Sequence, residues 1–129
     1  AVDQGLTVFI ISWVNPDQSY AETTFSDYMT EGAFAAIEAI KEATQQSTVN
    51  ALGFCVGGTL LATTLAYSAA KKQNSIHSAT FLTTLIDFTD PGEIGVFIDE
   101  LQIEAIEKRM KTEGYLDGRL IMNAFNMLR

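Results

Sequence analysis

The chain has 129 residues, of which 47% are hydrophobic and 10% aromatic, a composition typical of one folded domain with a hydrophobic core. Sixteen acidic residues and eight basic residues give a net charge of −8, which argues against a nucleic-acid-binding surface. A single cysteine excludes a disulfide framework and a cysteine-rich zinc site, so we expect no metal and a reducing, cytoplasmic location. We expect neither a signal peptide nor a transmembrane helix.

The first apolar run, residues 6–12 (LTVFIIS), predicts a strand that is buried on both faces of a parallel sheet. Residues 13–17 (WVNPD) end this strand as a loop, because Pro16 lacks a backbone donor and its polar neighbours favour turns. The loop follows the carboxyl end of a predicted parallel strand, which is the edge where such sheets bind ligands. A plain connector is the alternative interpretation.

A helix over residues 24–46 is predicted by a capping box at Thr24, with an acidic side chain three residues later. Its apolar residues recur at helical spacing, so we expect it to pack on the core. A second strand over residues 48–54, a second helix over 56–72 and a third strand over 78–86 follow. This alternation predicts an α/β fold with three parallel strands and flanking helices.

The character of the sequence changes after the third strand. Asp90 before Pro91 predicts the start of a long helix over residues 90–111. An apolar stripe along this helix contains Ile94, Phe97, Ile98, Leu101 and Ala105. Gly114 interrupts the helical pattern, and residues 117–128 predict a last helix.

The second strand ends at Cys55, and Gly53 and Gly57 lie two positions away on either side. This is the G-x-nucleophile-x-G elbow of the α/β-hydrolases, with cysteine in place of serine. Because side chains at the flanking positions would collide in such a tight turn, we expect both glycines to be required. The N-terminus of the following helix favours a thiolate, so we predict that Cys55 is a nucleophile. A small buried hydrophobe is the alternative role for a free cysteine.

Few groups in the sequence are placed to assist Cys55. The backbone N–H of Val56 is expected to be one donor of an oxyanion hole. His77, the one histidine, precedes the third strand at the amino end of the sheet, so we expect a solvent-facing loop residue rather than a base. Asp87 follows the third strand on the side of the elbow and is a candidate for the substrate site, with a turn role as the alternative. Asp90 is expected to be a helix cap.

Three blocks of sequence together resemble the catalytic domain of the polyhydroxyalkanoate synthases, the poly(3-hydroxybutyrate) polymerases, most closely the class I type. These blocks are residues 12–17 (SWVNPD), 52–59 (LGFCVGGT) and 82–88 (LTTLIDF). The resemblance covers essentially the whole chain, through residues 125–129 (FNMLR) in a region that looks like the family's lid. It implies a partial α/β-hydrolase core over residues 1–88, followed by a helical cap or lid over 89–129.

The resemblance implies an acyltransferase that builds a polyester from coenzyme A thioesters and needs no other cofactor. Cys55 would accept a 3-hydroxyacyl group and pass it to the growing polyester chain. The histidine and aspartate of the family have no matching positions here, and Asp87 matches a different family position near the site. We therefore expect the chain to be inactive alone, and to self-associate through exposed sheet edges or apolar surface. We expect it in the cytoplasm, at the surface of polyester granules.

Two other functions stay open at this point. A cysteine hydrolase of the thioesterase or dienelactone-hydrolase kind would share the elbow, but it would not explain the other two blocks. A non-catalytic interaction module derived from a synthase would retain Cys55 as a thiol of ordinary reactivity.

Overall fold

The computed structural model describes residues 1–127, without the side chains at positions 93, 94, 97, 121, 123–125 and 127. Contacts divide the chain into two compact units. Unit 1 contains Ala1–Ser12 and Thr24–Thr89, and unit 2 contains Trp13–Thr23 and Asp90–Arg129. The segment before the first long helix is therefore shared between the units. The prediction that the helices after residue 88 act as a cap or lid stays a prediction.

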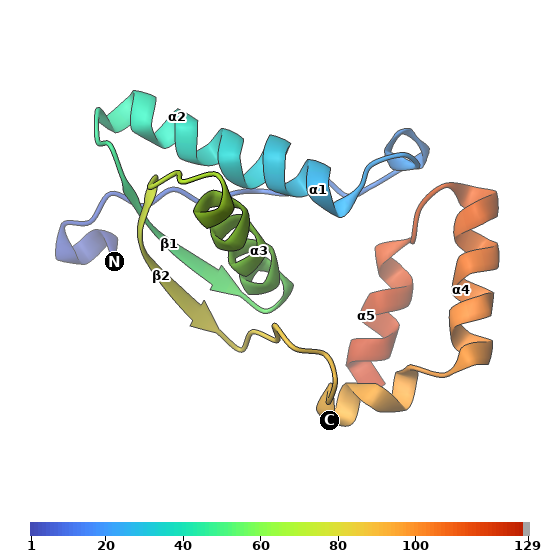
Figure 1. Ribbon diagram of the computed structural model, residues 1–129. Helices are drawn as coiled ribbons and strands as arrows, with labels where there is room; N and C mark the ends of the chain where they lie inside the picture. The colour runs from blue at the N-terminus through green and yellow to red at the C-terminus, as the bar shows by residue number, and fades with distance from the viewer. Residues whose placement is uncertain (128–129) are drawn as a thin grey trace. The chain divides into compact units, whose positions relative to one another are not determined.

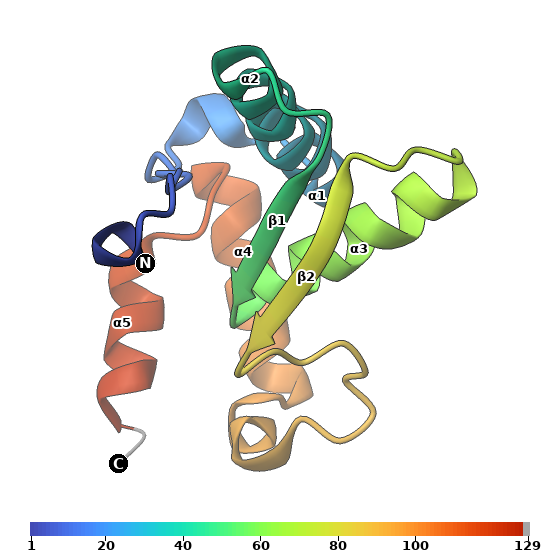
Figure 2. The same ribbon diagram turned by 90° about the vertical axis from the view of Figure 1, so that its left-hand side faces the viewer.

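Unit 1 is built around a parallel pair of strands and the helix that connects them. Strand β1 (Val49–Phe54) is followed by α3 (Val56–Ala70), and the chain returns as β2 (Ile76–Leu82) beside β1. Both strands point in the same direction, and their last residues, Phe54 and Leu82, pair across the sheet (Figure 2). The predicted second strand and second helix are confirmed, and the unit is a βαβ element of an α/β fold.

The helix predicted from the capping box is also present. It is continuous through α1 (Phe25–Asp27), a π-helical stretch (Tyr28–Phe34) and α2 (Ala35–Thr44) (Figure 1). The backbone N–H and hydroxyl of Thr24 each donate to Asp27 Oδ2 at 2.7 Å, and the Asp27 N–H donates back to the Thr24 hydroxyl at 3.3 Å. These bonds satisfy donors that a helix start otherwise leaves free.

The core of unit 1 lies where this long helix packs against α3, and α3 against the sheet. Its buried apolar side chains are Met29, Ile37, Leu60 and Leu61. Thr64 is fully buried in the same layer, and its hydroxyl donates to the Leu60 carbonyl at 2.8 Å, so this polar group is satisfied within α3.

Within unit 1, the described residues cover one face of the sheet and leave large apolar side chains exposed on the other. Along β1 the residues alternate, with Gly53 buried on the helix side and Leu52 and Phe54 exposed on the other side, at 63% and 64% of their surface. Leu82, which pairs with Phe54, is also exposed. The uncovered side therefore carries three large apolar side chains at the carboxyl end of the two strands.

Two predicted strands differ from the structure. Residues 6–12 form no strand, and β1 and β2 pair only with each other in the described part of the chain. Apolar residues form a buried strand only beside a partner strand, and the side chains here are exposed, with Ile10 at 86%. The third predicted strand, 78–86, begins earlier, at Ile76, and ends at Leu82, because Thr83 has a φ of 46° that an extended strand does not allow.

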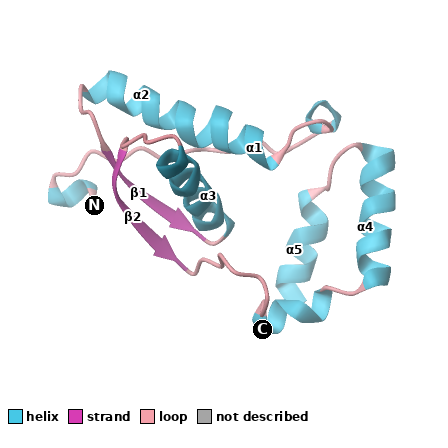
Figure 3. Ribbon diagram, viewed as in Figure 1, coloured by secondary structure: helices cyan, strands magenta, loops and turns pink. Residues whose placement is uncertain are grey.

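In unit 2, three helical segments follow one another after residue 90 (Figure 3). They are a 3-10 helix (Gly92–Phe97), α4 (Glu100–Glu113) and α5 (Gly118–Met127). Two further 3-10 helices, Val2–Gln4 in unit 1 and Gln18–Tyr20 in unit 2, are single turns. No helix within residues 1–127 is long and apolar enough to span a membrane.

The prediction of one helix over residues 90–111 is wrong. Ile98 has a non-helical backbone (φ −108°, ψ 84°), and Asp99 begins a new helix by accepting a hydrogen bond from the Gln102 N–H at 2.9 Å. The Asp90 carboxylate instead accepts from the Gly92 N–H in a local turn. In the predicted stripe the side chains at 94 and 97 lie outside the described residues, and Leu101 is 78% exposed.

The two later signals in this region are confirmed. Gly114 ends α4 in the left-handed conformation, with a φ of 83°, and Asp117 precedes α5 and accepts a hydrogen bond from the Arg119 N–H at 2.9 Å. The predicted last helix runs through Met127, and Leu128, its predicted end, lies outside the described residues.

Candidate active site

The connection between β1 and α3 consists of Cys55 alone. β1 ends at Phe54 and α3 begins at Val56, so the chain turns from strand to helix within one residue. Cys55 has φ 52° and ψ −126°, a region that residues other than glycine rarely occupy and that costs about 1–3 kcal/mol. Its side chain is exposed. The predicted elbow geometry is therefore present, and the buried-hydrophobe alternative is wrong.

Backbone hydrogen bonds fix Cys55 on both sides. Its N–H donates to the carbonyl of Leu82, at the end of β2, at 3.0 Å. Its carbonyl accepts from the N–H groups of Gly58 and Thr59, at 2.9 and 3.3 Å, in the first turn of α3. The main chain of Cys55 is thus held while the thiol faces solvent, an arrangement that presents a nucleophile without burying it.

Val56 is the first residue of α3, where backbone N–H groups have no acceptor within the helix. The position agrees with the predicted role of this N–H as a donor to a developing oxyanion, since that donor follows the nucleophile directly in elbows of this type. The role itself stays a prediction.

The glycines around Cys55 differ in what surrounds them. A side chain at Gly53 would collide with the first turn of α3, because its Cβ would lie 2.5 Å from Gly58 Cα. The expected need for a glycine is confirmed there. At Gly57 a Cβ would have no neighbour within 4 Å besides its adjacent residues and the backbone of α3 itself, so that part of the expectation is wrong.

Gly58 is the second glycine that the site requires, and our sequence reasoning missed it. It is buried, and a Cβ on it would lie 2.6 and 2.8 Å from Cγ2 and Cβ of Thr84, with the Thr84 hydroxyl closer still. The available signal was the pair Gly57-Gly58 at the start of a helix, where two helix-weakening residues in a row indicate close packing.

The loop after β2, residues 83–89, lies against the start of α3. The Thr59 hydroxyl donates to the Leu85 carbonyl at 2.7 Å, and the Thr84 hydroxyl donates to the Leu82 carbonyl at 3.1 Å. The Thr59–Leu85 bond and the Cys55–Leu82 bond join this region to the elbow, whereas the Thr84–Leu82 bond is local. Sequence reasoning also missed Thr59 and Thr84, since their contacts join residues 26 positions apart.

Asp87 is in this loop, five residues beyond the end of β2. Its Oδ1 accepts hydrogen bonds from the backbone N–H (2.9 Å) and hydroxyl of Thr89. The hydroxyl bond first and the backbone bond second lower the pKa of the Asp87 carboxyl, which therefore stays ionised at neutral pH. The turn role that we considered is present, and the predicted place in a substrate site stays a prediction.

His77 is exposed and is the second residue of β2, so its predicted place in a loop is wrong. Its place at the amino end of the sheet is confirmed, since neighbouring Ile76 pairs with Val49, the first residue of β1. Leu82, next to the elbow, lies five positions further along the extended strand, about 16–17 Å away. The structure therefore does not bring His77 to Cys55.

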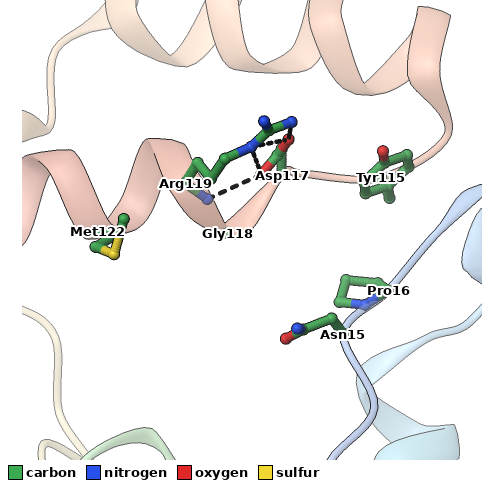
Figure 4. A pocket seen from close by; sticks show the side chains of 7 residues that line it. All are labelled: Asn15, Pro16, Tyr115, Asp117, Gly118, Arg119 and Met122. Atoms are coloured by element: carbon green, nitrogen blue, oxygen red, sulfur yellow. Dashed lines mark hydrogen bonds and ion pairs between the residues drawn. The ribbon is translucent and has the colours of Figure 1, made fainter.

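Unit 2 contains a separate open cavity of about 460 Å³ (Figure 4). Asn15 and Pro16, from the first motif block, form one side, and the other side is lined by Tyr115, Asp117, Gly118, Arg119 and Met122. Arg119 pairs with Asp117 across the start of α5, and this hydrogen-bonded partner is the main cause that lowers the Asp117 pKa to about 2. Cys55 belongs to unit 1 and does not line this cavity.

Within the described residues, no three side chains of His, Cys, Asp or Glu gather as metal ligands.

Comparison with known proteins gives one family match and several relatives. A family model described as the alpha/beta hydrolase fold matches residues 1–108. The chain is 58% identical to a poly(3-hydroxyalkanoate) polymerase of Methylorubrum extorquens, across 99% of this chain and 21% of the relative. It is 54% identical to the poly(3-hydroxyalkanoate) polymerase subunit PhaC of Rhizobium etli and 42% to that of Cupriavidus necator. Each match covers 99% of this chain, and 20% and 23% of the relative, respectively.

The chain thus spans about a fifth of the length of the curated relatives it matches. The relatives carry the family name to which the three sequence blocks pointed, so the predicted resemblance is confirmed.

Proposed function

Since the chain belongs to the α/β-hydrolase fold family and is similar along nearly its whole length to poly(3-hydroxyalkanoate) polymerases, we propose that it provides the acyl-accepting thiol of a polyester synthase. In this role it transfers 3-hydroxyacyl groups from coenzyme A thioesters to a growing polyester. The observation that carries the proposal is the conformation of Cys55: one exposed cysteine, strained and hydrogen-bonded at a strand-to-helix turn.

The proposed step is a thioester exchange. The Cys55 sulfur, as thiolate, attacks the carbonyl carbon of the substrate thioester, and a tetrahedral oxyanion forms near the N–H of Val56. The bond from that carbon to the sulfur of coenzyme A then breaks. The proton that left Cys55 ends on the released coenzyme A thiol. One thioester is exchanged for another, so the step is close to balanced in energy and needs no further reactant.

The second half of the reaction, transfer of the acyl group to a hydroxyl, needs a base that removes the hydroxyl proton. The one histidine of the sequence lies at the other end of β2, about 16–17 Å along the strand from the elbow. The Asp87 carboxylate accepts hydrogen bonds from Thr89. We therefore expect this chain alone to stop at the acylated cysteine.

The test is incubation with 3-hydroxybutyryl-CoA, with chromatographic measurement of free coenzyme A and of the acyl product, for the wild type and Cys55→Ala. The proposal predicts release of at most one equivalent of coenzyme A per chain, and none from the variant. Free 3-hydroxybutyrate in excess of the chain would instead indicate a hydrolase. Sustained polyester formation would contradict the expectation that the chain is inactive alone. No release at all would contradict the role of Cys55 and favour an interaction module.

We also propose that the partner of the uncovered sheet face is a second copy of this chain. Leu52, Phe54 and Leu82 are exposed there, and both strands have an edge without a strand partner among residues 1–127. Leu52→Lys should then shift the protein to a monomer in light scattering at high concentration. The matched control Leu101→Lys, at an exposed leucine of α4, should not. A wild type that stays monomeric would refute this proposal.

A further inference from the structure

We propose that Thr59 is a positioning residue for Cys55, because its hydroxyl holds the loop after β2 against the first turn of α3. The inference rests on the proposed role of Cys55 as nucleophile. Thr59 does not touch the thiol in this account. It acts through the backbone that fixes the conformation of the elbow.

The hydrogen bond of Thr59 differs from those of the other threonines in its helix. A threonine hydroxyl within a helix commonly donates to the carbonyl four residues earlier. Thr63 does so to Thr59 at 3.0 Å, and Thr64 does so to Leu60 at 2.8 Å. Thr59 instead donates out of the helix to the Leu85 carbonyl at 2.7 Å, in a half-buried position. Its hydroxyl therefore serves a tertiary contact.

This contact is one of three that join the same two segments, which we call the elbow clamp. The Cys55 N–H bonds the Leu82 carbonyl, Thr84 packs on Gly58, and Thr59 bonds Leu85. On the loop side the three contacts fall within residues 82–85, and on the elbow side within residues 55–59. The Thr59 bond closes the clamp at its far end, so the loop cannot move away from α3 while this bond is intact.

The segments joined by the clamp each contain a strained residue. Cys55 has φ 52° and Thr83 has φ 46°, and both are non-glycine residues in the left-handed half of the backbone map. Such conformations persist only where surrounding contacts over-determine them. Loss of the Thr59 hydroxyl would leave the loop free to relax at Thr83. The hydrogen bond from Cys55 to Leu82, which immediately precedes Thr83, would loosen with it.

Two variants separate the hydroxyl from the shape of the side chain. Thr59→Val keeps the shape and removes the donor, whereas Thr59→Ser keeps the donor. Thr63→Val is the matched control, because it removes a hydroxyl from an exposed threonine of the same helix whose bond is local. The readouts are the rate of Cys55 alkylation by iodoacetamide in the folded protein, and the rate of Cys55 acylation by 3-hydroxybutyryl-CoA.

We expect Thr59→Val to slow both reactions about tenfold or more, the scale at which small misplacements of a reacting group act. Thr59→Ser should restore at least half of the wild-type rate, and Thr63→Val should react as the wild type does. Equal rates for Thr59→Val and the wild type would overturn the inference, and so would a Thr59→Ser variant as slow as Thr59→Val. If circular dichroism shows that Thr59→Val does not fold, the reaction rates of Thr59→Ala, which lacks the hydroxyl, and Thr59→Ser, which keeps it, are compared instead.

The two reagents keep this inference separate from the proposed function. If wild-type Cys55 is alkylated but never acylated, the proposed function fails, and the alkylation rates alone decide the role of Thr59. If wild-type Cys55 is acylated and the Thr59→Val variant is acylated equally fast, the proposed function stands and the positioning role is refuted.

Discussion

Replacing Gly58 by alanine adds one methyl group at the point where the elbow and the loop after β2 are closest. The added Cβ would lie 2.6 and 2.8 Å from two carbon atoms of Thr84, whereas carbon atoms in favourable contact are about 3.5–4.0 Å apart. Thr84 is itself held by its hydroxyl bond to the Leu82 carbonyl. The loop must therefore shift, or the Thr84 side chain must rotate and lose that bond.

Gly57→Ala gives the reference for this effect. Both glycines are in the first turn of α3, so the gain in helix propensity from alanine is similar in the two variants. A methyl group at position 57 has no neighbour within 4 Å besides its adjacent residues and the backbone of α3. The difference between the two variants therefore isolates the overpacking, which typically costs about 1–3 kcal/mol. We expect Gly58→Ala to be less stable than Gly57→Ala by that amount in urea unfolding.

The double variant Gly58→Ala/Thr84→Gly tests the cause. Removal of the Thr84 side chain should restore a large part of the stability that Gly58→Ala loses, with a coupling free energy of about 0.5–3 kcal/mol between the two positions. Equal stability of the two single alanine variants would show that the elbow and the loop are not in close contact. A loss at Gly58 with no coupling to Thr84 would place the collision elsewhere.

Three further predictions follow from the same structure. Cys55→Gly should be more stable than Cys55→Ala by about 1 kcal/mol or more in urea unfolding, because only glycine adopts φ 52° and ψ −126° without strain. Equal stability of the two variants would mean that the elbow is not strained. Thr24→Ala should lower the free energy of unfolding by about 1 kcal/mol, because the helix cap is lost. The control Thr23→Ala, at the exposed residue before it, should leave the free energy of unfolding unchanged. Equal losses in the two variants would refute the capping box. Arg119→Met should raise the pKa of Asp117 from about 2 toward its ordinary value in an NMR titration. Since the pKa of Asp117 in the folded protein lies below its ordinary value, the contribution of Asp117 to stability is complete when the pH is above that ordinary value, and it is lost as the pH falls toward 2. An unchanged Asp117 pKa in the variant would show that the Arg119 side chain does not cause the shift.

The elbow could be predicted from sequence because its signals are local. Gly53, Cys55 and the helix pattern that follows lie within a few residues of one another, and the steric need at Gly53 arises within the turn itself. The capping box at Thr24 was recognisable for the same reason, since both of its partners lie within one helical turn.

Other features depend on partners that are distant in sequence. The apolar residues 6–12 have the composition of a strand, but a strand also needs a neighbour on its edge, and composition does not supply one. The contact between Gly58 and Thr84 joins residues 26 positions apart, so the two adjacent glycines indicate close packing but no local pattern identifies Thr84 as the partner. The break before α4 has a local signal that our sequence prediction did not use, because Asp99 is of a residue type that favours helix caps over helix interiors.

The central claim is that the elbow makes Cys55 an acyl acceptor, and intact-mass spectrometry after incubation with 3-hydroxybutyryl-CoA tests it most directly. The account predicts an adduct of one 3-hydroxybutyryl group per chain, located on Cys55 by peptide mapping and absent from Cys55→Ala. It also predicts that the adduct forms faster in the folded protein than in the same chain unfolded in urea. An adduct on another residue, or formation at the same rate in the folded and unfolded chain, would contradict the account.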